Sequence, residues 1–322
     1  MPSEFDLITR FFTRPAQGEG AVQLGVGDDC ALIAPPPHES LAVSSDMLVE
    51  GRHFLPGADP KLLGHKALAV NLSDLAAMGA KPICFTLALS LPAVDDAWLA
   101  AFADGLFTLA DAEQIVLIGG DTTRGPLTIC ITVLGHVPVH AALRRDGTHV
   151  GDDIWVSGNL GDARLGLELL THHRSLAAHH ADSALLRLHC PTPRVPLGLA
   201  LRGIASAAID ISDGLMGDLG HILQRSALGA SIEADALPIG TALRSQDRQL
   251  QLEFALNGGD DYELCFCASP SQREKVLAAS GGAGVAVTRI GTIEPIAGLR
   301  IIDHDGTPLP IRSHSFDHFA LS

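Results

Sequence analysis

Positive charge and aromatic side chains are both scarce in this sequence. Its 322 residues include 22 Lys plus Arg against 37 Asp plus Glu, which gives a formal net charge of -15, and aromatic residues make up only 4%. Nucleic acids and anionic membranes attract proteins that carry a positive field, and single strands stack on aromatic platforms. We therefore expect no nucleic acid and no membrane among the partners of this chain.

Long apolar runs and paired cysteines are also missing. No apolar stretch approaches the ~18 residues needed to cross a bilayer. The opening residues MPSEFDLITRFFTR lack the basic and apolar regions of a signal peptide. The six cysteines form no CxxC pair, and small buried side chains are the favoured interpretation of them. We expect a protein of the reducing cytoplasm.

The common phosphate-binding motifs are missing too. The sequence has no GxxxxGK[ST] loop, no kinase H-R-D or D-F-G motif and no H-E-x-x-H. The segment GVGDDC (25–30) resembles GxGxxG but ends in Cys30, and its two acidic residues would repel a pyrophosphate. P-loop and classical dinucleotide-binding folds are therefore disfavoured.

What the sequence does contain is an alternation of strand-like and helix-like segments. Its length suggests about two domains at ~150 residues each, and a hydrophobic content of 47% excludes wholesale disorder. A turn-rich stretch over 138–153 marks a boundary, which predicts domains 1–138 and 139–322. The pattern predicts strands at 21–26, 30–35, 41–48, 83–91, 115–120 and 128–137, helices at 59–80 and 95–112, and a late hairpin formed by RIGTIEP and LRIIDHDG. We expect an α+β or mixed α/β fold.

Short aspartate motifs stand at the ends of apolar strands. They are Gly27-Asp28-Asp29, Ser44-Ser45-Asp46, Gly119-Gly120-Asp121-Thr122-Thr123-Arg124, Asp210-Ile211-Ser212-Asp213 and Gly258-Gly259-Asp260-Asp261. Any one of them alone is an ordinary turn, because Asp and Gly are favoured turn residues. Five together point to converging carboxylates, which repel one another unless cations lie between them. Carboxylates beside hydroxyls suit Mg²⁺ or Mn²⁺ better than zinc.

Two of these aspartates have simpler explanations as well. Asp74 lies in a helix that is apolar nearly all round, so its carboxylate needs a partner. A backbone donor, Lys66 or a metal ion would each serve. Asp213 precedes a helical segment and could be its N-cap, a role that does not exclude metal binding.

In this order the motifs resemble the thiamine-monophosphate kinase family, within a superfamily that includes aminoimidazole-ribonucleotide synthetase. The stretches that carry the resemblance are LGVGDDCA, HFLPGADPKLLGHKALAVNLSDLAAMGA, LIGGDTTRGPL, IDISDGLMGDLGHI and GGDDYELCF. The resemblance implies transfer of the γ-phosphoryl of ATP to thiamine monophosphate, the last step of thiamine diphosphate biosynthesis, without a phosphoenzyme. It also implies a two-domain synthetase-like fold whose N-terminal sheet pairs with that of a second copy into a barrel. ATP and several Mg²⁺ ions would lie between an N-terminal dimerisation domain and a C-terminal α/β domain.

The resemblance also assigns roles to residues. The metal ligands or their close supports would be Asp29, Ser44, Ser45, Asp46, Asp74, Asp121, Asp210 and Asp213. Gly120, Asp121, Arg145 and Ser212 would meet ATP, and Asp121, Asp213 and Arg145 would act in catalysis. His53, Asp260 and Phe316 would meet the thiamine substrate. Ser45, Asp260 and Phe316 stand where the family usually has Thr, Glu, and Tyr or Trp.

The implied chemistry explains one further absence. A phosphate monoester has a second pKa of about 6 and is largely dianionic at pH 7. It needs no general base, and the motifs contain no obvious catalytic His or Lys. Two alternatives stay open. One is another ATP-dependent enzyme of the superfamily, and the other is a non-catalytic sensor of ATP or thiamine diphosphate.

Overall fold

The computed structural model describes residues 4–14, 21–26, 30–171 and 174–311 and forms two compact units. Unit 1 comprises Met1–Leu75 with Ala80–His140, and unit 2 comprises Ala76–Gly79 with Ala141–Ser322. In the part of the chain that is described, no helix is long and apolar enough to cross a membrane.

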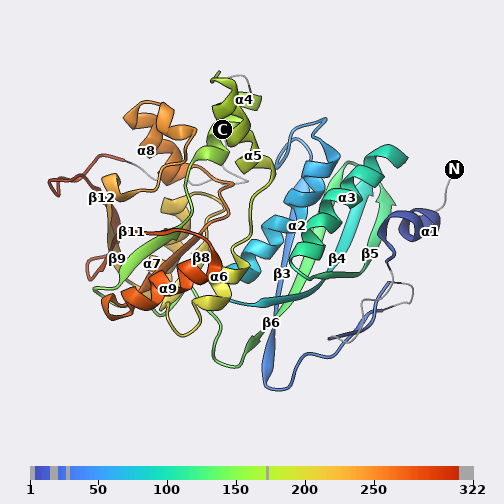
Figure 1. Ribbon diagram of the computed structural model, residues 1–322, viewed down its shortest axis with the longest axis horizontal. Coiled ribbons are helices and arrows are strands. Elements are labelled where there is room, and N and C mark those ends of the chain that lie inside the picture. Colours follow the sequence, from blue (N-terminus) through green and yellow to red (C-terminus); the bar gives the residue numbers. More distant parts are fainter. Residues whose placement is uncertain (1–3, 15–20, 27–29, 172–173, 312–322) are drawn as a thin grey trace. The chain divides into compact units, whose positions relative to one another are not determined.

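Unit 1 is built on a four-stranded sheet with the strand order β3-β6-β4-β5 (Figure 1). Its elements are α1 (Glu4–Leu7), the π-helical turn η1 (Ile8–Phe12), β1 (Val22–Leu24), β2 (Leu32–Ile33), β3 (Glu39–Val49), α2 (Pro60–Ala77), β4 (Lys81–Leu91), α3 (Asp96–Ala112), β5 (Val116–Arg124) and β6 (Thr128–Pro138). β6 pairs antiparallel with β3 and β4, whereas β4 and β5 are parallel. The strands and helices predicted for this half are present, and β5 continues to Arg124.

The two faces of this sheet differ. The side chain of Leu75 on α2 lies against Gly135 of β6, where an added Cβ would approach it to 3.1 Å. The face of β6 that holds Gly135 therefore looks toward α2, and its residues alternate with less buried ones on the opposite face. The hairpin of β1 and β2 packs over part of that opposite face, where Val22 and Ile33 lie against the buried cluster of Ile83, Cys84 and Ile118. We call the two sides the helix face and the open face.

The two helices begin where the sequence predicts. The Asp59 carboxylate accepts the N–H groups of Lys61 and Leu62 at the start of α2. Asp95 caps α3 in the same way, because a side-chain oxygen satisfies N–H groups that have no partner within the first turn.

Unit 2 is a six-stranded sheet with the order β12-β9-β11-β7-β10-β8. Its elements are β7 (Asp153–Ser157), α4 (Asp162–Leu170), α5 (Ala178–His189), α6 (Val195–Ala200), β8 (Ala207–Asp210), α7 (Leu215–Ser226), β9 (Gly229–Glu233), the 3₁₀ turns η2 (Ala234–Ala236) and η3 (Leu243–Ser245), α8 (Arg248–Asn257), β10 (Leu264–Ala268), the 3₁₀ turn η4 (Pro270–Gln272), α9 (Arg273–Ala283), β11 (Val287–Glu294) and β12 (Gly298–Ile302). One face of the sheet forms the core with α4, α7 and α8. Trp155 and Phe266 stack on the other face.

The predicted late hairpin is wrong. β11 and β12 do not pair with each other, because β9 lies between them and pairs antiparallel with β11 and parallel with β12. Gly229 at the start of β9 allows this insertion. A Cβ at that position would lie 1.8 Å from the carbonyl oxygen of Ile296, in the link between β11 and β12. Sequence proximity favoured the hairpin, but the backbone of β9 takes the pairing positions of both strands.

A buried ion pair ties β7 to α9 and β11. Arg273 Nε and Arg289 Nε donate to the two carboxylate oxygens of Asp153 at 2.6 and 2.7 Å. Burial by itself would raise the pKa of Asp153, but the hydrogen bonds and charges of the two arginines outweigh it and lower this pKa below its ordinary value of 3.8. The ion pair therefore stabilises the fold when Asp153 is charged.

Replacing this carboxylate gives the first testable prediction. Asp153→Asn is expected to lower the free energy of unfolding by about 2 kcal/mol at neutral pH, because the three charged hydrogen bonds from Arg273 and Arg289 are weakened. A lowered pKa stabilises the folded state above the ordinary Asp value, and this stabilisation is lost as the pH falls through the lowered value. The difference in melting temperature between wild type and variant should thus shrink below about pH 4. A difference that does not change with pH would contradict the ion-pair explanation.

Candidate functional site

Ser44 and Asp74 meet on the helix face of the unit 1 sheet. Ser44 Oγ donates to Asp74 Oδ2 at 2.5 Å, and the N–H of Asp46 donates to Asn71 Oδ1 at 3.0 Å. These bonds join β3 to one side of α2. Because side chains alternate along a strand, Asp46 and Ser44 share the helix face. The hydroxyl of Ser44 is a partner for Asp74 that the sequence did not reveal.

Ser45 lies on the open face instead. Its hydroxyl is 2.9 Å from Thr132 Oγ1 and donates to the carbonyl oxygen of Ile131 at 3.2 Å. The structure therefore does not bring the Ser45 side chain together with those of Ser44 and Asp46. Only the backbone of Ser45 lies between Ser44 and Asp46.

Gly120 and Asp121 lie at the opposite edge of the same sheet. Asp121 of β5 pairs with Ala88, which pairs with Cys130, which in turn pairs with Met47. Asp121 is therefore three strand spacings from β3, or about 14 Å. Its side chain shares the open face with Met47, so it points away from the side that holds Asp46.

The backbone at Gly120 requires glycine. Its φ is +149°, and an added Cβ would lie 1.8 Å from the carbonyl oxygen of Leu87. Any side chain here would separate β5 from β4 and displace the neighbouring Asp121. This is a physical reason for glycine beside the aspartate.

His53 follows β3 closely, whereas two other predicted residues are outside the described structure. The N–H of Val49 donates to His53 Nδ1 at 3.0 Å, which fixes the ring and makes Nδ1 the acceptor. Asp29 and Phe316 lie outside the described residues.

In unit 2, the loop after β8 is supported by a residue that the sequence did not single out. Asp218, in the first turn of α7, accepts the N–H groups of Ser212 at 3.0 Å and Asp213 at 3.1 Å. Gly214, with φ +112°, is the N-cap of α7, so the suggestion that Asp213 caps this helix is wrong. Burial raises the pKa of Asp218 to about 7, although the backbone N–H groups of this loop favour its charged form. An acidic residue in a first helical turn was the available signal.

The predicted substrate residue Asp260 lies beside this loop. The N–H of Asp260 donates to the carbonyl oxygen of Ser212 at 2.9 Å, and Tyr262 N and Ile211 O are joined at 2.8 Å. A third bond, at 2.8 Å, runs from Ile211 N to the carbonyl oxygen of Glu263. Residues 210–213 contain two of the predicted metal ligands, and we call them the metal loop. Residues 258–263 contain the predicted substrate residue Asp260, and we call them the substrate loop. These three bonds hold the two loops together.

Arg145 lies in an exposed stretch, and hydrogen bonds to Asp152 hold the residues that follow it. Asp152 accepts hydrogen bonds from Thr148 Oγ1, His149 N and Ser206 Oγ. Among the described residues, Arg145 has no ion-pair partner, whereas its neighbour Arg144 pairs with Asp146. Arg145 is thus a cation within an acidic chain that could meet an anionic ligand.

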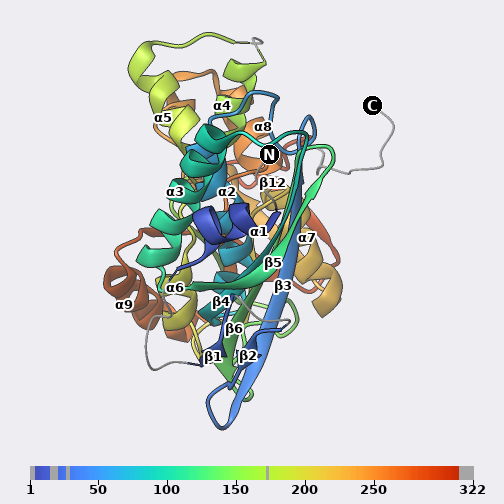
Figure 2. The ribbon, with the colours of Figure 1, turned by 90° about the vertical axis from the view of Figure 1, so that its right-hand side faces the viewer.

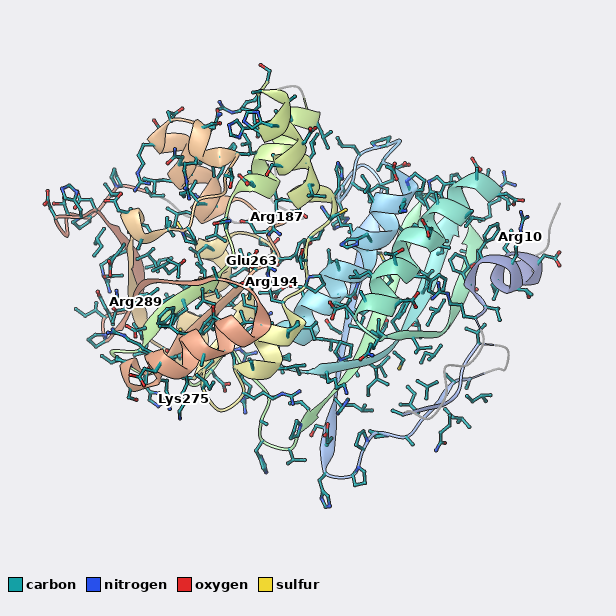
Figure 3. The ribbon with its side chains drawn as sticks, viewed as in Figure 1. Arg10, Arg187, Arg194, Glu263, Lys275 and Arg289 are labelled. Carbon is teal, nitrogen blue, oxygen red and sulfur yellow. The ribbon has the colours of Figure 1, made fainter. Side chains whose placement is uncertain are left out.

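Glu263 is a second residue that the sequence did not single out. It is fully buried and accepts hydrogen bonds from Arg187, Arg194 and Ser157 (Figure 3). Its position directly before the apolar strand LCFCA was the available signal. A charged residue in such a place must be buried and therefore paired.

The donor atoms suit Mg²⁺ in type. Ser44, Asp46 and Asp74 on unit 1 offer only oxygen, as do Asp210 and Asp213 on unit 2, and oxygen ligands are what Mg²⁺ prefers. Neither set is complete by itself. Across the described ranges, no three His, Cys, Asp or Glu side chains form a group that could hold a metal ion.

Comparison with known families matches both halves of the chain. Residues 27–137 match the family model described as AIR synthase related protein, N-terminal domain, and residues 149–304 match the model of its C-terminal domain. The chain is 48% identical to thiamine-monophosphate kinases of Salmonella typhimurium and of Escherichia coli K12, over 98% of each sequence. A relative of the same name in Haemophilus influenzae is 45% identical over 99% of this chain and 98% of its own length.

Solved structures give the same result. The crystal structure of thiamine-monophosphate kinase from Stenotrophomonas maltophilia superposes with a TM-score of 0.84 at 49% identity, covering 89% of this chain and 92% of that one. A structure described as AaThiL complexed with AMPPCP and TMP has a TM-score of 0.77 at 28% identity and covers 89% of both chains. The hydrogenase maturation protein HypE of E. coli, at 23% identity and a TM-score of 0.78, shares the fold.

Proposed function

The chain belongs to the thiamine-monophosphate kinase family, and we propose that it transfers the γ-phosphoryl group of ATP to thiamine monophosphate, giving thiamine diphosphate and ADP. The observation that carries this proposal is the 48% identity to kinases of that name over 98% of each sequence. A structural relative at 28% identity is described as complexed with AMPPCP, an ATP analogue, and TMP, which supports the same pair of substrates. The cytoplasmic location expected from the sequence stays a prediction.

The site residues divide into groups with separate tasks. We assign Ser44, Asp46 and Asp74 to one set of metal ligands and Asp210 with Asp213 to another. Asp29 and the backbone of Ser45 complete the proposed set, with Asp121 at the other sheet edge. Mg²⁺ held by these residues would supply positive charge that compensates the negative charge of the phosphates.

The remaining residues bind and orient the substrates. Arg145 has no ion-pair partner in the described chain, and we assign it to the phosphates of ATP, together with the backbone of Gly120 and the hydroxyl of Ser212. His53, Asp260 and Phe316 are assigned to the thiamine substrate. No residue needs to take a proton from the acceptor, because its phosphate is already largely dianionic at neutral pH. The protein therefore accelerates the reaction by positioning and by charge compensation.

We further propose that the chain works as a homodimer that pairs through β3. This strand is an edge of the sheet and runs for 11 residues (Figure 2). On its open face, Val43 is 61% exposed, Met47 55% and Leu41 44%. Long apolar edge strands are normally covered, because they readily pair with other strands. A second copy would cover this edge and close the open face, as in the barrel that the resemblance implies.

The proposed dimer also brings Asp121 to a metal site, that of the second copy. Within one chain, Asp121 is about 14 Å from β3 and on the other face of the sheet, so it cannot share an ion with Asp46 there. We infer that Asp121 completes the metal site of the second copy.

A substrate panel tests the proposed reaction. ADP release is measured with thiamine monophosphate and, in parallel, with other phosphate monoesters and with amide-bearing ribonucleotides. We expect turnover with thiamine monophosphate alone. Faster turnover with another acceptor would move the protein to a different reaction of the superfamily. Tight binding of thiamine diphosphate without any ADP release would indicate a sensor instead.

A further inference from the structure

Glu263 is a fully buried carboxylate that holds several parts of unit 2 together. We propose that Glu263, clamped by Arg187 and Arg194, is a positioning residue that sets the substrate loop and, through it, the metal loop. This inference rests on the proposed function, because Asp260 and Asp213 lie on these two loops. Glu263 has no exposed surface, so it acts on the substrates only through the backbone of these loops.

The clamp is made of charged and well-directed bonds. Arg194 donates through Nε to Glu263 Oε2 at 2.6 Å and through Nη2 to Oε1 at 2.5 Å, a two-bond arrangement. Arg187 Nη2 donates to Glu263 Oε1 at 2.9 Å and also to the carbonyl oxygen of Asp261 at 2.9 Å. Arg187 thus binds both the carboxylate and the backbone of the substrate loop. Parallel bonds of this kind fix geometry as well as adding energy.

The arginines come from two separate parts of unit 2. Arg187 is in the last turn of α5, and Arg194 is the N-cap of α6. Ser157, at the end of β7, donates its hydroxyl to Glu263 Oε2 at 2.5 Å and accepts the N–H of Leu264 at 2.9 Å. Glu263 therefore ties two helices and a central strand to the base of the substrate loop (Figure 3).

The Glu263 carboxylate is tightly packed against its neighbours. A Cβ at Gly158 would lie 2.1 Å from Glu263 Oε1, so the residue after β7 must be glycine for the carboxylate to fit. Both Glu263 and Asp261 have no exposed surface. The two carboxylate oxygens of Asp261 accept the N–H of Gly161 at 2.8 and 3.1 Å, at the start of α4. The loop is thus anchored at two residues, with Tyr262 between them.

The loop needs such anchors because its backbone is strained. Asp260 has φ +67° and Tyr262 has φ +48°, a region that residues with a Cβ adopt at a cost. Strained conformations persist only where surrounding contacts hold them. The anchors at Asp261 and Glu263 alternate with the two strained residues, so loosening Glu263 would let Tyr262 and then Asp260 relax.

A movement of the substrate loop would also displace the metal loop, because the two backbones are bonded to each other. Three backbone hydrogen bonds join the loops, from Asp260 to Ser212, from Tyr262 to Ile211 and from Ile211 to Glu263. A Cβ at Gly259 would lie 2.5 Å from the carbonyl oxygen of Ser212, which shows how closely the backbones approach. A shift of the substrate loop therefore moves Ser212 and Asp213 as well.

Glu263→Gln tests this role, because the amide keeps the size of the side chain and loses its charge. We expect kcat/KM for thiamine monophosphate to fall by about 100-fold, the effect of a small misplacement at a reacting group. KM for thiamine monophosphate should rise more than KM for ATP, since Asp260 lies on the loop that Glu263 anchors. The N–H groups of residues 258–263 should also exchange hydrogen faster, as measured by mass spectrometry in the absence of any substrate.

Asp153→Asn is the matched control. Asp153 is also a buried carboxylate held by two arginines, but its bonds join β7 to α9 and β11, away from both loops. It should lower the melting temperature while leaving kcat/KM and the exchange of residues 258–263 unchanged. If Glu263→Gln does not fold, Arg194→Lys replaces it, because lysine keeps the charge and loses the two-bond geometry.

The outcomes separate this inference from the proposed function. Equal kinetic constants and equal hydrogen exchange in wild type and Glu263→Gln would overturn the positioning role. A matching kinetic loss in Asp153→Asn would also overturn it, since general destabilisation would then explain both. If the wild-type protein does not phosphorylate thiamine monophosphate, the proposed function fails, and hydrogen exchange still decides whether Glu263 holds the loop.

Discussion

Asp46→Asn and Asp121→Asn are each expected to lower kcat by roughly 1000-fold while the protein stays folded. Two highly anionic phosphate groups must meet within a chain that has a net charge of -15. Each variant removes one negative charge from a position that we assign to cation binding. The loss should therefore appear first as weaker binding of Mg²⁺ and of Mg²⁺-ATP, which titration calorimetry measures directly.

Asp104→Asn is a suitable control for this pair. Asp104 is an exposed aspartate of unit 1 that pairs with Lys61 on the protein surface, and it belongs to no proposed site. It changes the net charge by the same amount, so it should leave turnover unchanged. Turnover near the wild-type value at limiting Mg²⁺ in either Asp46→Asn or Asp121→Asn would contradict the assignment.

The second large effect is expected when the two inactive variants are combined. Asp46 and Asp121 lie on opposite edges and opposite faces of one sheet. If one copy supplies Asp46 and its partner supplies Asp121, a mixed dimer of the two variants contains one intact site and one doubly altered site. Activity should therefore return when the two proteins are mixed and allowed to exchange subunits.

The expected size of this recovery follows from simple counting. Random exchange makes half of the dimers mixed, and each of these has one intact site of two, so activity should reach about a quarter of the wild-type value. Mass spectrometry under native conditions confirms that mixed dimers have formed. Mixed dimers without recovered activity would show that Asp46 and Asp121 act within the same chain or at unrelated sites.

Local structure could be predicted well from the sequence, because it depends on neighbouring residues. The α2 helix carries apolar residues nearly all round, and it is buried as expected. Its start at Asp59 and that of α3 at Asp95 follow from side chains that satisfy the first N–H groups. Motif order was sufficient to indicate the family, which the comparisons confirm.

Strand order could not be predicted, and the mistakes follow from this. The hairpin of β11 and β12 fails because β9 lies between them, a pairing that depends on contacts far apart in the sequence. For the same reason, Ser44 and Ser45 looked like one group until the sheet placed them on opposite faces. The separation of Asp46 from Asp121 is likewise a property of the sheet order and of no local motif.

The partners within buried polar networks also could not be predicted from the sequence. The partners of Glu263 are Arg187, Arg194 and Ser157, which are 76, 69 and 106 residues away in the sequence. Asp218 supports the metal loop from a helix whose sequence reads as an ordinary amphipathic segment. A charge beside an apolar strand signals that a partner exists, but only the folded chain identifies it.

The most direct test of the account compares two acceptors. Thiamine monophosphate and free thiamine are each incubated with ATP, with and without Mg²⁺, and ADP and the thiamine products are quantified. Because the phosphate acceptor is already deprotonated and we assign the role of a general base to no residue of the site, we predict equal amounts of ADP and thiamine diphosphate from the monophosphate, only with Mg²⁺, and no product from free thiamine. Phosphorylation of free thiamine at a comparable rate, or transfer that proceeds without a divalent cation, would contradict the account.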